Sequence, residues 1–130
     1  MVIELHEHEP PSLEGASLYR ALRADVRYRF VVVAPGSGYE VAHEDGDPDG
    51  AGGVVLVEPF EVPPGEDQRF LAAWREAHAA LAAQRGYLGA RLYRNAAPGE
   101  PRWMEMARWS SPLMYSRAGG EGALYLPARE

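Results

Sequence analysis

The chain of 130 residues contains no cysteine and no lysine, and its only asparagine is Asn95. Without cysteine, neither a disulfide framework nor a thiolate metal site is available. All 13 basic residues are arginines, against 19 acidic residues, and the formal net charge is −6. A chain with this charge lacks the basic face that phosphate binding requires, so nucleic acid is not expected among its partners.

Long apolar runs are also missing from the sequence. No stretch reaches the ~18 apolar residues of a membrane span. The first residues, MVIELHEHEPP, are too acidic for a signal peptide. We therefore expect a cytoplasmic protein that does not bind membranes. With 46% apolar and 25% charged residues, the composition is typical of a globular protein.

Glycine and acidic residues are concentrated between residues 35 and 53, in PGSGYEVAHEDGDPDGAGG. This composition predicts a linker. The linker divides the chain into a strand-rich part, residues 1–34, and a longer part, residues 54–130. In the first part, MVIELHEH predicts one strand, and LYRALRADVRYRFVVVA predicts two strands around a turn at Ala24 and Asp25.

The longer part predicts secondary structure in the order β-α-β-β-α-β, which is that of a ferredoxin-like α+β domain. A long amphipathic helix is expected over Asp67–Gln84, and Ser110-Ser111-Pro112 is typical of the start of a short helix. The apolar stripe of the long helix consists of Phe70, Ala73, Trp74, Ala77 and Leu81. Strands are expected at Val54–Val62, Tyr87–Arg94, Arg102–Trp109 and Ala123–Pro127, with a loop over residues 95–101.

Two sequence blocks of the first part recur, in the same order, in the longer part. Gly15–Arg20 (GASLYR) matches Gly89–Arg94 (GARLYR) at five of six positions, and Phe30–Ala34 aligns with Trp103–Ala107. We interpret residues 1–34 as a partial repeat of the later unit. On this interpretation the repeat kept a strand, a loop and a strand, and lost its first strand and its helix.

Three motifs of the longer part occur in a characteristic order. They are PFEVPPGE, an F-x3-W pair on the expected long helix, and GYLGARLYR followed by a strand that ends in Trp109 and by Ser-Ser-Pro. From Val54 to Tyr125 this pattern resembles the antibiotic biosynthesis monooxygenase family. The resemblance implies a dimeric α+β barrel, in which two ferredoxin-like subunits pack sheet to sheet. A homodimer is therefore expected, with Met104 and Met106 in the core between the subunits.

The resemblance also implies a pocket between sheet and helices, which the terminal Trp109 faces. Strand alternation then directs Glu105 and Trp103 to the same side. Cofactor-free members of the family commonly carry an asparagine where this chain has Glu105, and haem-degrading members carry one where it has Glu58. Asn95 lies in a hairpin loop and replaces neither, but a carboxylate at these positions can act as a base.

Glu58 and Glu105 are expected on neighbouring antiparallel strands, where they can lie opposite each other. Two carboxylates in an apolar pocket raise at least one pKa. Alternatively, one or both face solvent or pair with Arg94 or Arg108. The candidate catalytic residues are Glu105, Trp109 and Glu58, and the candidate substrate-binding residues are Trp74, His78, Trp103 and Tyr115. His78 either flanks a core tryptophan or carries protons at the edge of the pocket.

No tightly bound cofactor is expected. No histidine follows His78, which disfavours a haem ligand after Trp109. No glycine-rich dinucleotide fingerprint occurs, so a reduced flavin would act as a diffusible co-substrate.

No metal site is expected either. Asp45, Asp47 and Asp49 mimic the start of a calcium loop, but Leu56 stands at the twelfth position, so a solvated acidic loop is expected. His6 and His8 share one face of a strand, with His43 elsewhere, and the sequence places no further ligand beside them.

Three functions stay open at this point. The first is an oxygenase of antibiotic biosynthesis, which oxidises a small phenolic or anthrone-like aromatic polyketide with O2. The second is a polyketide cyclase or isomerase that uses Glu105 as a base on the same scaffold. The third is a non-catalytic, ligand-binding dimer.

Overall fold

The computed structural model describes residues 1–12, 14–96 and 101–128. These residues form one antiparallel sheet of eight strands and two helices. The strand order is β1-β3-β2-β8-β5-β7-β6-β4. The strands are β1 (Val2–His6), β2 (Ser17–Ala21), β3 (Phe30–Ala34), β4 (Tyr39–Gly46), β5 (Val54–Phe60), β6 (Tyr87–Asn95), β7 (Trp103–Trp109) and β8 (Leu124–Pro127). The helices are α1 (Asp67–Ala82) and α2 (Pro112–Arg117).

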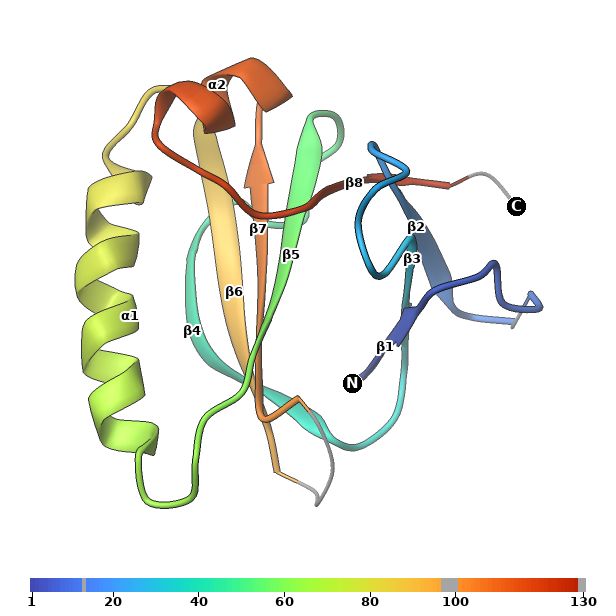
Figure 1. Ribbon diagram of the computed structural model, residues 1–130, viewed down its shortest axis with the longest axis horizontal. Helices are drawn as coiled ribbons and strands as arrows, with labels where there is room; N and C mark the ends of the chain where they lie inside the picture. The colour runs from blue at the N-terminus through green and yellow to red at the C-terminus, as the bar shows by residue number, and fades with distance from the viewer. Residues whose placement is uncertain (13, 97–100, 129–130) are drawn as a thin grey trace.

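The second half of the chain has the predicted ferredoxin-like order, β5-α1-β6-β7-α2-β8. Figure 1 shows α1 alongside β6, β7 and β5, with β1, β2 and β3 on the other side of these strands. At the start of α2, the Ser111 hydroxyl accepts a hydrogen bond from the Met114 amide (3.2 Å), which confirms the predicted helix start. The predicted loop over residues 95–101 lies partly outside the described residues. None of the described helices is long and apolar enough to cross a membrane.

The buried face of α1 differs in part from the predicted stripe. Trp74 and His78 are its buried residues, whereas Ala73 and Ala77 are exposed. Residues four apart lie on one helix face, and the large indole ring turns that face toward the sheet because it buries more apolar area than an alanine does. The helix therefore packs on the Trp74 and His78 line, and the alanines lie on the solvent side.

The predicted linker over residues 35–53 is wrong in its middle part, because Tyr39–Gly46 forms β4. This strand pairs with β6 from Tyr39 opposite Asn95 to Gly46 opposite Gly89. It lies at the edge of the sheet. Edge strands commonly carry charged residues, which limit pairing with other chains. The acidic composition that resembles a linker is thus compatible with an edge strand.

The internal repeat has a structural counterpart in the register of two strand pairs. In β2 and β3, Arg20 lies opposite Phe30. In β6 and β7, the aligned residues Arg94 and Trp103 lie opposite each other in the same way. The sequence blocks that resemble each other therefore occupy equivalent places in two equivalent hairpins.

The first strand of the repeat is present, contrary to the prediction that it was lost. His6 of β1 lies opposite Phe30, and Phe60 of β5 lies opposite Trp103, so β1 pairs with β3 as β5 pairs with β7. Among the described residues, neither helix has a counterpart, since no helix lies between β1 and β2 where α1 would be, or between β3 and β4 where α2 would be. The glutamate- and proline-rich connection in the place of α1 has no helical periodicity that would have revealed the equivalence.

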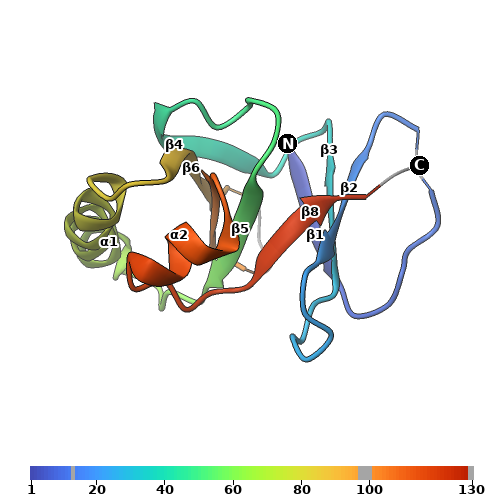
Figure 2. The ribbon, with the colours of Figure 1, turned by 90° about the horizontal axis from the view of Figure 1, so that it is seen from above.

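The fourth strands complete an internal pseudo-symmetry. β4 of the first half pairs with β6 of the second, and β8 of the second half pairs with β2 of the first. Accordingly, the Tyr39 hydroxyl donates to the Pro101 carbonyl (2.7 Å), and the Tyr125 hydroxyl donates to the Tyr28 carbonyl (2.5 Å). The Tyr39 amide also donates to the Met1 carbonyl (2.8 Å), so the two edges of the curled sheet meet. Figure 2 shows this curl from above.

The core between the two halves corrects the expected role of the β7 methionines. Met104 is fully buried among residues of both halves, and Met106 packs against the same cluster. This core consists of Ile3, Val31, Tyr39, Val57, Tyr93, Met104 and Tyr125. Strands of the same chain thus cover the face that was assigned to a partner subunit. The homodimer expected from the sequence is therefore not needed to bury this apolar face.

Candidate active site between β7 and α1

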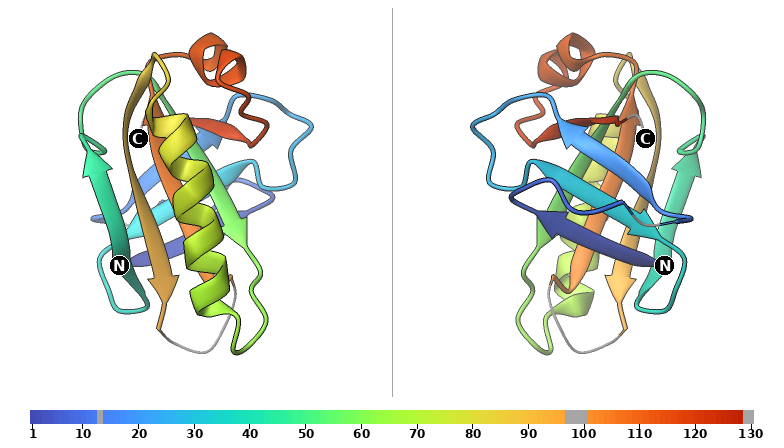
Figure 3. Two further views of the ribbon diagram at one scale, coloured as in Figure 1. Left: turned by 90° about the vertical axis from the view of Figure 1, so that its left-hand side faces the viewer. Right: turned by 90° about the vertical axis from the view of Figure 1, so that its right-hand side faces the viewer.

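The face of β7 toward α1 carries the residues that strand alternation predicted to lie together. Trp103, Glu105 and Trp109 are all buried. Trp103 packs in a cluster with Trp74 of α1, and Trp109 packs in a second cluster with Leu81 of α1. In the left view of Figure 3, α1 lies across β5, β7 and β6. A carboxylate is therefore enclosed between a sheet and a helix.

Glu105 is the buried carboxylate of this site, with 6% of its surface exposed. The Trp74 indole Nε1–H donates a hydrogen bond to its Oε1 (3.0 Å). Burial raises the pKa of Glu105 to about 7; the Trp74 hydrogen bond opposes this shift, and the negative charge of Glu58 adds to it. At neutral pH this carboxylate is poised to accept a proton.

Glu58 lies directly opposite Glu105 in the pairing of β5 with β7, as predicted. It is half-buried, and burial raises its pKa as well. The alternative partners are engaged elsewhere, since Arg94 pairs with Asp67 (3.3 Å) and Arg108 donates to the Asp47 carbonyl (3.0 Å). The two carboxylates therefore face each other without an arginine between them.

Aromatic side chains lie at both ends of the site. Trp109 lies edge-on to Tyr115 of α2 (5.3 Å between ring centroids) and to Tyr87 (5.4 Å). At the other end, the Trp103 indole donates to Asp67 in the first turn of α1 (3.1 Å). Trp103 is thus fixed at the start of the helix, and Trp109 and Tyr115 lie at its opposite end.

His78 is buried and takes part in a cluster that sequence reasoning missed. Its ring stacks on Trp74 (4.4 Å between centroids), and its Nε2 lies 2.8 Å from Oδ2 of Asp45. The Nε2 of His43 lies 2.6 Å from the same oxygen, and the Tyr87 hydroxyl donates to the other oxygen, Oδ1. Burial opposes ionisation of Asp45, but these hydrogen bonds hold its pKa below the ordinary value.

A β-bulge in β4 brings this cluster together. Val41 lies opposite Tyr93, but His43 lies opposite the next residue, Leu92, so one extra residue is inserted in β4. The insertion turns His43 and Asp45 toward α1, on the side of Leu92. The predicted solvated acidic loop is therefore wrong for Asp45. No motif marks such a bulge, and only the two imidazoles and the carboxylate themselves could have pointed to the cluster.

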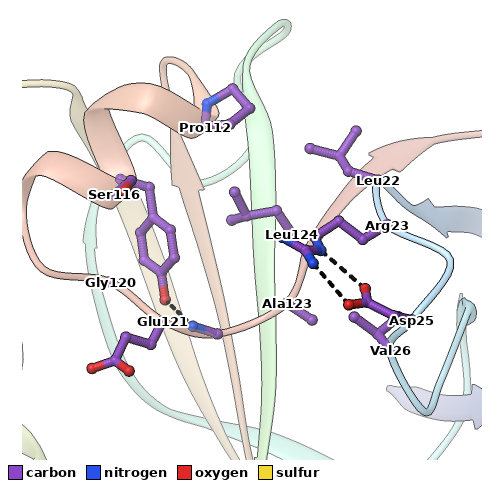
Figure 4. Close-up of a pocket in the computed structure, with 12 residues that line it drawn as sticks. Leu22, Arg23, Asp25, Val26, Pro112, Ser116, Gly120, Glu121, Ala123 and Leu124 are labelled. Atoms are coloured by element: carbon purple, nitrogen blue, oxygen red, sulfur yellow. Dashed lines mark hydrogen bonds and ion pairs between the residues drawn. The ribbon is translucent and has the colours of Figure 1, made fainter.

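A pocket of about 420 Å³ lies beside this site, between the β2–β3 connection and the segment from α2 to β8. Figure 4 shows Leu22, Arg23 and Asp25 on one side and Ser116, Gly120 and Glu121 on the other. The Tyr115 hydroxyl, in its wall, accepts a hydrogen bond from the Gly122 amide (2.9 Å). A Cβ built on Gly122 would lie 3.1 Å from Oε1 of Glu58. Gly122, which lines the pocket, therefore lies close to the Glu58 carboxylate.

Fold and site together define a ferredoxin-like α+β protein with a buried carboxylate between its sheet and its long helix. Residues 53–112 match the model of the antibiotic biosynthesis monooxygenase family, which confirms the resemblance predicted from the sequence. A search of curated proteins finds no match.

Solved structures share the fold at low sequence identity. A haem-degrading enzyme from Listeria monocytogenes is 17% identical, with a TM-score of 0.55, over 82% of this chain and 67% of that one. A monooxygenase-like protein from Listeria innocua is also 17% identical (TM-score 0.57; 80% and 62%). An uncharacterised ferredoxin-fold protein related to antibiotic biosynthesis monooxygenases, from Listeria monocytogenes, is 14% identical (TM-score 0.54; 92% and 83%).

Proposed function

We propose that this protein is an oxygenase that removes a proton from an electron-rich phenolic or anthrone-like substrate and exposes the resulting anion to O2. The buried carboxylate of Glu105, with a pKa raised to about 7, supports this proposal most directly. A base with a pKa near the working pH combines the correct protonation state with a useful driving force for proton transfer. The match of residues 53–112 to a monooxygenase family supports the reaction class.

The proposed reaction balances without a bound cofactor. Glu105 takes a proton from the substrate CH2 or phenol group, and the carbanion-like carbon then gives an electron to O2. Recombination forms a C–O bond, and loss of water from the hydroperoxide leaves a carbonyl group. One oxygen atom enters the product and the other leaves as water. Reduced flavin, if it takes part, acts as a diffusible co-substrate.

The substrate is proposed to bind from the pocket shown in Figure 4, which Tyr115 lines. Trp109, which lies edge-on to Tyr115, would then contact the substrate once it has entered. Displacement of the segment around Gly122 would connect this pocket with Glu58 and Glu105. Trp74 orients the Glu105 carboxylate through its indole N–H. Trp103 and His78 complete the enclosure and keep water from the reacting carbon.

A cyclase or isomerase is the second candidate, because Glu105 as a base serves proton transfer or aldol chemistry equally well. Oxygen separates the two functions. An oxygenase consumes O2 and is inactive under argon, whereas a cyclase turns over in both conditions. One of the similar structures, from Listeria monocytogenes, is named a haem-degrading enzyme, so haem is a further substrate to be tested.

The decisive experiment measures O2 uptake with a panel of anthrones and naphthols, with and without reduced flavin, and includes a haem titration. We expect uptake with an anthrone- or naphthol-like substrate, and its loss in Glu105→Gln. Glu76→Gln is the matched control, because Glu76 is an exposed residue of α1. If the panel produced no uptake while haem was bound and degraded, the phenolic substrate class would be excluded.

A further inference from the structure

The cluster of His43, Asp45 and His78 has the composition of a metal site. We propose that it binds one divalent transition-metal ion. Each residue offers one ligand atom, and these atoms all lie within 4.8 Å of one another. The inference does not depend on the proposed oxygenase reaction, because metal binding is measured without turnover.

The ligand atoms already point at a common position. The Nε2 atoms of His43 and His78 lie 2.6 and 2.8 Å from the same oxygen of Asp45. The centroids of the two imidazole rings are 5.4 Å apart, with the rings inclined at 78°. With metal–ligand bonds of about 2.0–2.2 Å in tetrahedral geometry, two ligand atoms of one ion lie about 3.3–3.6 Å apart. Asp45 is one-third exposed, so a small side-chain rotation gives this spacing.

The positions of the three side chains are set by the fold, and the cluster is not a random grouping of surface residues. His78 is 5% exposed, and the bulge in β4 turns His43 and Asp45 toward it. The Tyr87 hydroxyl donates to the second oxygen of Asp45 and lies 3.2 Å from Nε2 of His78. Partners of this kind orient metal ligands in proteins.

The surrounding charges also favour a cation at this position. The neighbouring acids are paired with arginines: Glu44 and Asp49 with Arg91, and Asp47 with Arg108. The Asp45 carboxylate, in contrast, lies against the imidazoles of His43 and His78. With neutral imidazoles the three ligands carry one negative charge. The charge of Asp45 also contributes to the raised pKa of the buried Glu105.

The ligand chemistry selects the class of metal. Two imidazoles and one carboxylate suit Zn(II), Co(II), Ni(II) or Fe(II), whereas Mg(II) and Ca(II) prefer oxygen ligands alone. Three protein ligands leave coordination positions open for water or a small molecule. The competing role is a hydrogen-bonded cluster that joins β4 to α1 without any metal.

Titration of the chelator-treated full chain with Co(II) and Zn(II) tests the proposal. We expect one equivalent to bind by calorimetry, with visible Co(II) absorption bands that Zn(II) abolishes. His43→Ala and Asp45→Asn should lose this binding, while circular dichroism of the metal-free variants verifies their fold. Tyr87→Phe, which removes only a supporting hydroxyl, should weaken binding about 10–100-fold.

His6→Ala is the matched control. His6 and Glu4 form the same contact two residues apart on β1 (3.1 Å), but they are not part of the three-ligand group. Retained binding in His6→Ala, with loss in His43→Ala, supports the site. Absence of stoichiometric binding, or equal binding in both variants, would overturn it. Glu105→Gln should keep the metal while losing turnover, so the two proposals fail separately.

Discussion

Glu58 and Glu105 are direct partners across β5 and β7, and the second of them is almost completely buried. The charge of Glu58 makes ionisation of Glu105 less favourable, and α1 shields Glu105 from water. A fold that only needed stability would place apolar residues here. The pair is therefore the feature of this chain from which most of its chemical behaviour should follow.

Glu105→Gln should change the pH dependence of stability. The pKa of Glu105 in the folded state, about 7, is above that of the unfolded chain. Its contribution is therefore complete below pH 4.5 and is lost as the pH rises toward 7. Between these values the wild-type chain should lose about 3 kcal/mol of unfolding free energy relative to Glu105→Gln. Urea titrations of both proteins at several pH values measure this difference, and parallel profiles would contradict it.

Glu58→Gln should move the pH–activity profile to lower pH. The charge of Glu58 contributes to the raised pKa of Glu105, so its removal lets the base ionise at lower pH. We expect the activity of the wild-type protein to rise through pH 7, and that of the variant to rise earlier. Glu105→Gln itself should lower the turnover rate about 10²–10⁴-fold. An unchanged profile in Glu58→Gln would show that the two groups titrate independently.

Trp74→Phe should move the profile in the opposite direction. The indole hydrogen bond stabilises the ionised form of Glu105, so its loss raises the pKa of that carboxyl further. An unfolding free energy lower by about 1–3 kcal/mol is expected, because a buried acceptor loses its partner. Trp103→Phe is the control, since that indole donates to Asp67 instead. It should lower stability and leave the pH profile in place.

Tyr39→Phe and Tyr125→Phe should destabilise the chain by similar amounts. The two hydroxyls make equivalent hydrogen bonds across the halves, to Pro101 and Tyr28. Each substitution should cost about 1 kcal/mol of unfolding free energy. Tyr28→Phe keeps the carbonyl that Tyr125 uses and should change the stability by less than about 0.5 kcal/mol. Strongly unequal costs for Tyr39 and Tyr125 would contradict their equivalence.

Light scattering should give the mass of a single chain, 14.3 kDa. The first half covers Met104 and the face around it, which is the role that a second subunit plays in the dimer expected from the sequence. Because the chain itself covers this face, no second subunit is needed to bury it. A dimer at micromolar concentration would show that another surface, outside this core, drives association.

Much of the fold could be predicted from local sequence, because period and turn residues are local properties. The apolar period indicated α1, Ser110-Ser111-Pro112 marked the start of α2, and alternation sorted β7 into two faces. The opposition of Glu58 and Glu105 followed from strand order alone. The recurrence of GASLYR as GARLYR also indicated two equivalent hairpins.

The sequence by itself thus determined the ferredoxin-like half and its carboxylate pair. Only the tertiary structure decided that β4 lies in the segment expected to be a linker, and that the first half covers the Met104 face of the second. It also decided that a bulge turns His43 and Asp45 toward His78. The physical reason is that strand pairing and bulges depend on partners distant in the chain. Glycine and acidic residues carry little information about which partner β4 will take.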